Sequence, residues 1–230
     1  MTVRVAIVED EPLYRGLLEQ HLARHPHLEV VGTYADGAAA VEGVADVAAD
    51  VVTLDIELPG GVDGIQTALT LRARDARLGI VILSNHADPR FLGALPREVT
   101  SGWSYLLKKS VSNVETLERA IEGAANGTVT LDPAIVAAMQ PKAGGASAHL
   151  TPRQREILAL VAQGLSNAAI GDRLVLAEKS VENQLTSIYG ELGIDRRASA
   201  EVHPRVSAVL AYLRDSRIGP RASRVSRATG

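Results

Sequence analysis

The 230-residue sequence predicts a doubly wound α/β domain with a five-stranded parallel sheet, followed by a small all-α helix-turn-helix domain. In the first 126 residues, short apolar runs alternate with helical stretches, which is typical of a parallel sheet covered on both faces. From residue 150 onward, apolar residues recur only at helical spacing. Between the two patterns, residues 140–149 are small, polar and rich in Gly, as in a linker.

The first domain, 1–126, is expected to contain five strand–helix units. The expected strands are Val3–Val8, Glu29–Tyr34, Val51–Leu54, Ile80–Leu83 and Ser104–Leu107. The expected helices are Leu13–Arg24, Ala38–Ala48, Ile65–Ala73, Pro89–Leu95 and Val114–Ala125. Residues 127–149 are interpreted as the linker, within which Asp132–Met139 could form a short helix.

The second domain, 150–213, is expected to be helical throughout. Thr151 is an N-cap followed by Pro at the first helical position, and Gly164 ends this helix. Ser166 caps a second helix, and a third runs from about Glu178.

A fourth helical stretch, Ser199–Leu213, carries an apolar stripe that could form a dimer contact or pack on the domain's own core. The stripe consists of Val202, Val206, Val209, Leu210 and Leu213. The Arg-rich tail, 214–230, is expected to be disordered.

Composition excludes several classes of protein. The absence of Cys excludes disulfides, thiol catalysis and Cys-based zinc sites. No window offers the ~20 apolar residues of a membrane span, and the N-terminal apolar run is too short for a signal peptide, so we expect a cytoplasmic protein with no membrane partner. Residues 1–139 hold 11 Lys and Arg against 19 Asp and Glu, whereas residues 140–230 hold 13 against 8. The basic half is the candidate for contact with nucleic acid, although solvated surface would show the same asymmetry.

Polar residues follow four of the expected strands. Glu9 and Asp10 come after the first, Asp55 after the third, Ser84 after the fourth and Lys108 after the fifth. Because the carboxyl ends of parallel strands meet at one edge of a sheet, these side chains are expected to converge there. Ordinary strand-end polarity would explain any one of these positions, but hardly all of them in this order.

Such an acidic cluster without His or Cys is a hard oxygen site that favours Mg²⁺. A carboxylate such as Asp55 can also act as a nucleophile and form an aspartyl phosphate. Mg²⁺ held by Glu9 and Asp10 could offset the charge repulsion of that attack. Lys108 could then pair with the phosphoryl group, and the Ser84 hydroxyl could donate to it.

Four segments carry a family resemblance: VRVAIVEDEPLYR, DVVTLDIELPGGVDGI, VILSNHADP and SYLLKKS. Through them, residues 1–126 resemble a receiver domain of the CheY-like superfamily, which implies phosphorylation by a sensor histidine kinase. The implied site residues are Asp55 as phosphoacceptor, Glu9, Asp10, Asp55 and the Glu57 backbone carbonyl as Mg²⁺ ligands, and Ser84, Tyr105 and Lys108 as the switch. Lys108 is preferred to Lys109 because of its spacing from Tyr105.

The sequence departs from the receiver pattern near the switch. The turn after Asp55, LPGGVDG, is longer than usual, with the insertion at 60–61. The stretch between Ser84 and Tyr105 is also longer, and it ends in GWSY where the family has Gly directly before the aromatic residue. These departures put the switch geometry in question more than phosphorylation itself.

The third helix of the second domain has an apolar face formed by Val181, Leu185 and Ile188. Its polar side holds Lys179, Glu182, Asn183, Thr186 and Ser187. Such side chains can bind base edges or phosphates, although a plain three-helix bundle would also have a polar outer face.

The opening LTPRQREIL, the GLSN cap and the SVENQL…LGI ending make residues 150–197 resemble a LuxR-type helix-turn-helix. A receiver joined to this domain resembles the NarL/FixJ group of two-component response regulators. That resemblance implies a transcription regulator that binds double-stranded promoter DNA, as a homodimer when active, with Ser180–Leu192 as the main part of the recognition helix. The implied DNA-binding residues are Lys179, Ser180, Glu182, Asn183, Thr186, Ser187, Arg196 and Arg197. Glu182 and Gln184 stand where the family often has a basic residue and a His, so we expect a shallow salt dependence of DNA binding.

Two other functions are weighed against this one. The Asp55-x-Glu57 pattern faintly resembles haloacid-dehalogenase-type phosphatases, but their motif follows the first strand, so we expect no enzyme. The alternative is a DNA-binding regulator whose receiver is not phosphorylated. The complete set of acids, Ser and Lys argues against that alternative, and the altered switch region keeps it open.

Overall fold

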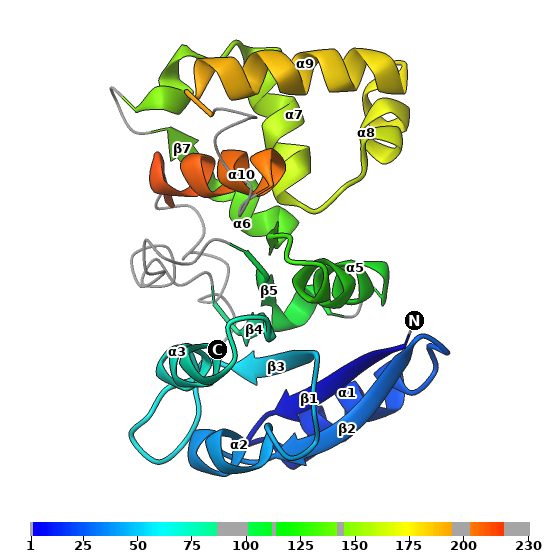
Figure 1. The fold of residues 1–230 in the computed structure, drawn as a ribbon, viewed down its shortest axis with the longest axis vertical. Coiled ribbons are helices and arrows are strands. Elements are labelled where there is room, and N and C mark those ends of the chain that lie inside the picture. Colours follow the sequence, from blue (N-terminus) through cyan, green and yellow to red (C-terminus); the bar gives the residue numbers. More distant parts are fainter. Residues whose placement is uncertain (1, 87–100, 112–113, 142–144, 195–202, 219–230) are drawn as a thin grey trace, which may run out of the picture. The chain divides into compact units, whose positions relative to one another are not determined.

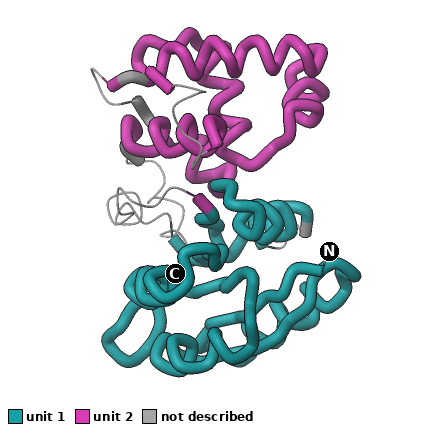
Figure 2. The backbone as a smooth tube through the Cα atoms, viewed as in Figure 1, with its two compact units in different colours: residues 1–86, 102–130 teal, residues 87–101, 131–230 magenta. Residues whose placement is uncertain are grey.

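The computed structural model describes residues 2–86, 101–111, 114–141, 145–194 and 203–218 (Figure 1). These residues form two compact units, one up to His86 and from Gly102 to Thr130, the other from Leu131 onward (Figure 2). The expected helix Pro89–Leu95 and the residues Arg196 and Arg197 lie outside the described residues.

The first unit is built on a sheet with the strand order β2–β1–β3–β4–β5–β6. Figure 1 labels the first five strands of the chain, β1 to β5. The strands are β1 (Val3–Val8), β2 (Leu28–Tyr34), β3 (Val51–Asp55), β4 (Gly79–Ser84), β5 (Trp103–Leu107) and β6 (Thr130–Leu131). The pairs β1–β2, β1–β3, β3–β4 and β4–β5 are parallel, which confirms the five expected strands. Within the described residues this sheet has six strands and not the expected five. The sequence did not predict β6 because a strand of two residues is too short to show an apolar pattern.

Helices of the first unit follow the strands as expected, with small differences at their ends. They are α1 (Pro12–Leu22), α2 (Gly37–Gly43), α3 (Gly64–Arg74) and α5 (Val114–Ala125), with a 3₁₀ turn η1 (Lys108–Ser110) after β5. Asp36 and Asp63 cap α2 and α3 by accepting from the backbone N–H groups of Ala39 and Gln66. The expected helix Ala38–Ala48 is shorter in the structure, and Ala48 itself has a left-handed φ of 44°.

The core of this unit joins α1 and α5 to the sheet. Leu18 and Leu22 of α1 pack in one buried cluster with Leu117 and Ile121 of α5. The cluster also includes β-strand residues such as Val81, so α1 and α5 cover the same face of the sheet. β3, β4 and β5 are buried along their whole length, as expected for strands covered on both faces.

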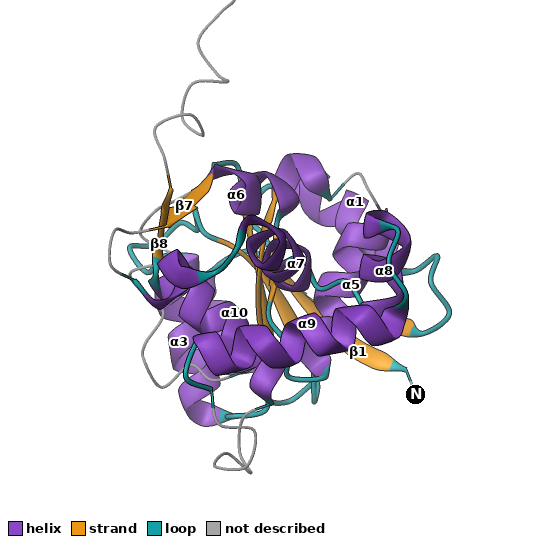
Figure 3. Ribbon diagram, turned by 90° about the horizontal axis from the view of Figure 1, so that it is seen from above, coloured by secondary structure: helices purple, strands orange, loops and turns teal. Residues whose placement is uncertain are grey.

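Helices dominate the second unit (Figure 3). Its elements are α6 (Pro133–Ala138), β7 (Met139–Pro141), η2 (Ala146–His149), α7 (Pro152–Ala162), α8 (Asn167–Leu174), α9 (Glu178–Glu191), α10 (Pro204–Arg214) and β8 (Ser216–Ile218). Thr151 and Gln154 form a capping box at the start of α7, and Ser166 caps α8. Gly164, with φ 77°, follows the end of α7. These caps were the local signals that predicted α7 and α8, whereas apolar spacing predicted α9, whose N-cap Ala177 makes no side-chain cap.

The apolar stripe of α10 packs on the core of its own unit. Val206, Val209, Leu210 and Leu213 are all buried, and α10 contacts α7, α9 and η2. Of the two interpretations left open by the sequence, the structure therefore shows packing on the domain's own core. Val202 lies outside the described residues.

Residues 139–141 and 216–218 pair as the antiparallel strands β7 and β8. The expectation of a disordered tail from residue 214 is therefore wrong for residues 214–218, and the linker segment contributes α6, β7 and η2. Asp215 reinforces this junction, because its Oδ2 accepts a hydrogen bond of 3.0 Å from the backbone N–H of Ser147. Pairing between segments so far apart in sequence leaves no local pattern to detect.

Among the described residues, we find no helix whose length and apolar character would allow it to span a membrane.

Candidate functional site

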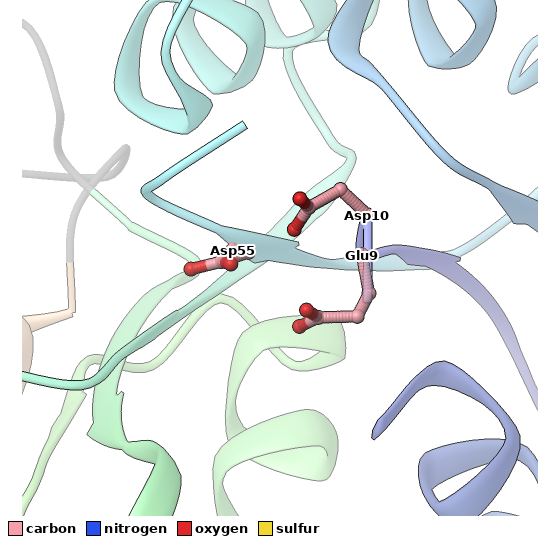
Figure 4. A group of neighbouring side chains, drawn as sticks. All are labelled: Glu9, Asp10 and Asp55. Carbon is pink, nitrogen blue, oxygen red and sulfur yellow. The ribbon is translucent and has the colours of Figure 1, made fainter. Parts of the chain in front are cut away.

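Three carboxylates meet at the carboxyl edge of the sheet. Glu9 and Asp10 directly follow β1, and Asp55 ends β3. One oxygen of each lies within 4.8 Å of the others, and Figure 4 shows the three side chains gathered in front of the strand ends. β1 and β3 are neighbours where the strand order reverses, which is the place where open parallel sheets bind ligands.

Lys108 places an ammonium group between two of these carboxylates. Its Nζ lies 2.9 Å from Asp55 Oδ2 and 2.8 Å from Glu9 Oε2. Glu9 is 0% exposed and Asp55 3% exposed, so both carboxylates are shielded from water. The ammonium also lies 4.6 Å from the centre of the Tyr14 ring, a cation–π distance. The spacing that favoured Lys108 over Lys109 thus selected a residue that lies in the site.

The electrostatics of the site reflect crowded negative charge. Burial raises the pKa of Glu9, the hydrogen bond from Lys108 opposes this, and the charge of Asp55 adds to the rise. Burial alone would lower the pKa of Lys108, but its hydrogen bonds to Glu9 and Asp55 outweigh burial and raise it. The ammonium therefore stays charged, and the three carboxylates still outnumber it.

The donor set fits Mg²⁺. Glu9, Asp10 and Asp55 offer only carboxylate oxygens, which are the ligands that hard divalent cations prefer. The Asp10 side chain is exposed, so the site is open to solvent on that side. The backbone N–H of Glu57 donates to Asp55 Oδ1 at 3.2 Å, which fixes the orientation of the carboxylate.

Ser84 and Tyr105 share one hydrogen-bond acceptor. The Ser84 hydroxyl and the Tyr105 hydroxyl each donate to the backbone carbonyl of His86, both at 2.8 Å. Tyr105 is fully buried and Ser84 nearly so. Sequence reasoning missed His86, because a residue that acts through its carbonyl leaves no side-chain signal.

The polar face of α9 is exposed, as the sequence predicted. Val181, Leu185 and Ile188 are buried on the opposite side. Lys179 Nζ forms an ion pair of 2.7 Å with Glu182 Oε2, and Ser187 Oγ accepts from Gln154 Nε2 of α7 at 3.2 Å. The Thr186 hydroxyl donates to the Glu182 carbonyl. Ser180 and Asn183 are exposed as well.

Each of the two units matches a known protein family. Residues 5–122 match the family described as the response regulator receiver domain, and residues 148–203 match the luxR family of bacterial regulatory proteins. The DNA-binding transcriptional activator DevR/DosR of Mycobacterium tuberculosis is 34% identical over 207 residues, which cover 87% of this chain and 93% of that protein. The chain belongs to the NarL/FixJ-type response regulators.

Another curated member shows similar coverage, and a solved receiver domain matches the first unit. The nitrate/nitrite response regulator NarL of Escherichia coli is 30% identical over 207 residues, which cover 86% of this response regulator and 93% of that protein. The signal receiver domain of NarL from M. tuberculosis, a solved structure, is 31% identical and covers 53% of this chain and 98% of that domain, with a TM-score of 0.46. This response regulator is thus a transcriptional regulator with a receiver domain and a LuxR-type DNA-binding domain.

Proposed function

We propose that a sensor histidine kinase phosphorylates this response regulator on Asp55, with Mg²⁺ bound by Glu9, Asp10, Asp55 and the backbone carbonyl of Glu57. The phosphorylated protein then controls transcription by binding promoter DNA through α9. The observation that supports the acceptor assignment is the arrangement of Lys108, which lies within 2.9 Å of both Asp55 and Glu9 at the carboxyl edge of the sheet. We infer a DNA-binding regulator and not an enzyme.

The chemistry is transfer of a phosphoryl group from a kinase imidazole to a carboxylate. An Asp55 oxygen attacks phosphorus, the P–N bond of the phosphohistidine breaks, and its electron pair returns to the imidazole, which takes up a proton. Bound Mg²⁺ would supply positive charge that offsets the repulsion between carboxylate and phosphoryl oxygens. Lys108 donates to the new phosphoryl oxygens, since its ammonium already lies 2.9 Å from Asp55 Oδ2.

The phosphoryl group also gives the Ser84 hydroxyl a new acceptor. In the described structure this hydroxyl donates to the His86 carbonyl, and the Tyr105 hydroxyl donates to the same carbonyl. When Ser84 turns to the phosphoryl group, the His86 carbonyl loses the Ser84 donor and keeps only the Tyr105 hydroxyl of the two. We propose that this loss of a contact carries the effect of Asp55 phosphorylation to the receiver surface. The changed surface then favours a homodimer.

A homodimer presents two copies of α9 to paired half-sites in the major groove. Lys179, Ser180, Asn183 and Thr186 supply donors and acceptors for bases and phosphates, and Glu182 can accept from cytosine. Ser187, Arg196 and Arg197 complete the proposed contacts. The described residues of this list all lie on α9.

The experiment that tests the proposal combines a small-molecule phosphodonor with Mg²⁺ on three full-length proteins. Intact mass and binding to genomic DNA fragments are measured for wild type, Asp55→Asn and Glu57→Gln. The last is the matched control, because only the backbone of Glu57 is proposed to bind the metal. Wild type and Glu57→Gln are expected to gain one phosphoryl group and bind DNA more tightly, whereas Asp55→Asn gains none.

An equal mass gain in wild type and Asp55→Asn, or no gain in wild type, would contradict the assignment of Asp55. If treatment leaves DNA binding of all three proteins unchanged, the regulator acts without phosphorylation.

A further inference from the structure

The receiver unit holds a second group of potential metal ligands on elements that the acidic site does not use. Three of the six His residues lie in the segment HLARHPH, at positions 21, 25 and 27, between the end of α1 and the start of β2. Glu118 and Glu122 face them from α5, and their i, i+4 spacing puts both on one side of that helix. We refer to His25, His27, Glu118 and Glu122 as the His–Glu cluster.

Direct contacts connect the whole cluster. His25 Nδ1 contacts Glu118 Oε1, and His27 Nε2 lies 3.6 Å from the same oxygen. His27 Nε2 also lies 3.1 Å from Glu122 Oε1. The four side chains are between 20% and 50% exposed, so an ion from solvent can reach them.

The backbone that carries the cluster is held by the fold. The His25 N–H donates to the Leu22 carbonyl at 3.0 Å, and the His27 carbonyl accepts from the Val3 N–H at 2.8 Å. Leu22 and the α5 residue Ile121 belong to one buried core, so the end of α1 and the surface of α5 keep their relative position. A site whose ligands stand on packed elements loses little conformational entropy on binding.

We propose that His25, His27, Glu118 and Glu122 bind a divalent transition-metal ion of the zinc type. Imidazole with carboxylate is a ligand set that suits Zn²⁺, in contrast to the all-oxygen set of Glu9, Asp10 and Asp55. In a tetrahedral site with Zn–N and Zn–O bonds of about 2.0–2.2 Å, neighbouring ligand atoms are about 3.3–3.6 Å apart. Of the two His27 separations, 3.6 Å lies at the upper end of that spacing and 3.1 Å lies just below it.

Binding requires the side chains to move, because among the described residues only Glu9, Asp10 and Asp55 form a group whose ligand atoms all lie within 4.8 Å of one another. The four ligand atoms run in a chain from His25 through Glu118 and His27 to Glu122, and the metal has to draw them around one point. Rotation of the Glu118 carboxylate away from His25 opens that contact. This carboxylate is partly exposed, so it has room to turn.

A metal ion would complement the charge of this cluster. It would bind the imidazole nitrogens of His25 and His27 and supply positive charge between the Glu118 and Glu122 carboxylates.

Metal binding would join the end of α1 and the start of β2 to α5. It would therefore stabilise the receiver unit independently of the acidic site, since a ligand that binds only the folded state raises its unfolding free energy. This gives the receiver a second input, by metal availability, that does not depend on phosphorylation of Asp55.

The test uses full-length, metal-free protein in excess Mg²⁺, which occupies the acidic site. Zn²⁺ is titrated in competition with a chromophoric chelator, and the melting temperature is recorded with and without Zn²⁺. The variants are His27→Gln and Glu118→Gln, with His149→Gln as the matched control because His149 is exposed and lies in the other unit. Asp10→Asn is included to separate the two sites.

Wild type, His149→Gln and Asp10→Asn are expected to bind one equivalent of Zn²⁺ and to melt at a higher temperature with it. His27→Gln and Glu118→Gln are expected to bind at least about tenfold more weakly. If either variant fails to fold, Glu122→Gln replaces it, because that side chain is half exposed. Wild type that binds no Zn²⁺, or cluster variants that bind as wild type does, would overturn the proposal and leave the contacts as ordinary His–Glu pairs.

Discussion

Lys108 Nζ lies 2.9 Å from Asp55 Oδ2, and the same ammonium lies 2.8 Å from Glu9 Oε2. One cation thus serves two buried carboxylates that come from the ends of different strands. The pairing explains how β1, β3 and the turn after β5 can hold like charges close together. Lys108 and a bound metal ion would therefore both offset the negative charge of the carboxylates.

Replacing Lys108 by Met should destabilise the metal-free protein, because Glu9 and Asp55 would then face each other in a buried site without a counter-charge. Breaking a buried ion pair by removing one partner costs about 3–5 kcal/mol. We expect a loss of about 3 kcal/mol in the free energy of unfolding by urea at pH 7, with part of it restored by Mg²⁺. Lys109→Met is the control, since Lys109 is exposed and should change stability by less than about 0.5 kcal/mol. Equal stability of wild type and Lys108→Met would show that the ion pair does not hold the site together.

Replacing Glu9 by Gln should stabilise the metal-free protein at neutral pH. Burial raises the pKa of Glu9 above its ordinary 4.5, so the folded state retains this proton more strongly than the unfolded chain does. As pH rises above 4.5 the unfolded chain ionises first, and Glu9 lowers the unfolding free energy progressively. Below that pH both states are protonated, and the effect vanishes.

The measurement is urea unfolding of wild type and Glu9→Gln across this pH range, without divalent cations. The advantage of the variant should grow from pH 4 toward pH 7. A difference that does not change with pH would mean that the Glu9 charge is not the cause. Added Mg²⁺ should favour wild type, because Gln offers the metal a weaker ligand.

Local signals in the sequence account for most of the fold. The apolar run Val3–Val8 and the amphipathic stretch Val114–Ala125 form a strand and a helix with the bounds that were expected. The convergence of Glu9, Asp55 and Lys108 also followed from sequence, because the strand ends of a parallel sheet share one edge.

What the sequence could not predict depends on contacts between distant segments. The strand Ser216–Ile218 exists through its pairing with Met139–Pro141, and neither segment is long enough to show alternation. Ser84 and Tyr105 are joined through the backbone carbonyl of His86. Every residue has such a carbonyl, so the residue type at position 86 could not predict this contact.

Val175 should be replaceable by Asn with a gain in stability. This residue ends α8 in the left-handed conformation, with φ 55° and ψ 51°, and it is 91% exposed. A left-handed conformation costs an L-residue with a Cβ about 1–2 kcal/mol, and Asn adopts it more readily than a β-branched residue. The exposed side chain has little packing to lose, so thermal unfolding of Val175→Asn should show a gain of about 1 kcal/mol.

Val175→Gly serves as the comparison for this substitution. Glycine relieves the same strain, but it also increases the freedom of the unfolded chain, so its gain should be smaller. A Val175→Asn protein less stable than wild type would show that this side chain makes contacts that outweigh the backbone strain.

Lys179 should make the salt dependence of DNA binding steeper, and Glu182 should make that dependence shallower. The two side chains form an ion pair of 2.7 Å, but they are 78% and 45% exposed, so the pair contributes little and can open at a phosphate. Lys179→Ala should make the plot of log affinity against log salt shallower by about 1, because one phosphate contact is lost.

Glu182→Gln should make the same plot steeper and raise non-specific affinity, since Lys179 is released and a negative charge is removed. Glu19→Gln makes the same charge change at an exposed position of the receiver unit and should leave the slope unaltered. Equal slopes for all four proteins would place the phosphate contacts elsewhere than on α9, because a basic residue that touches DNA cannot be removed without changing the number of counterions released.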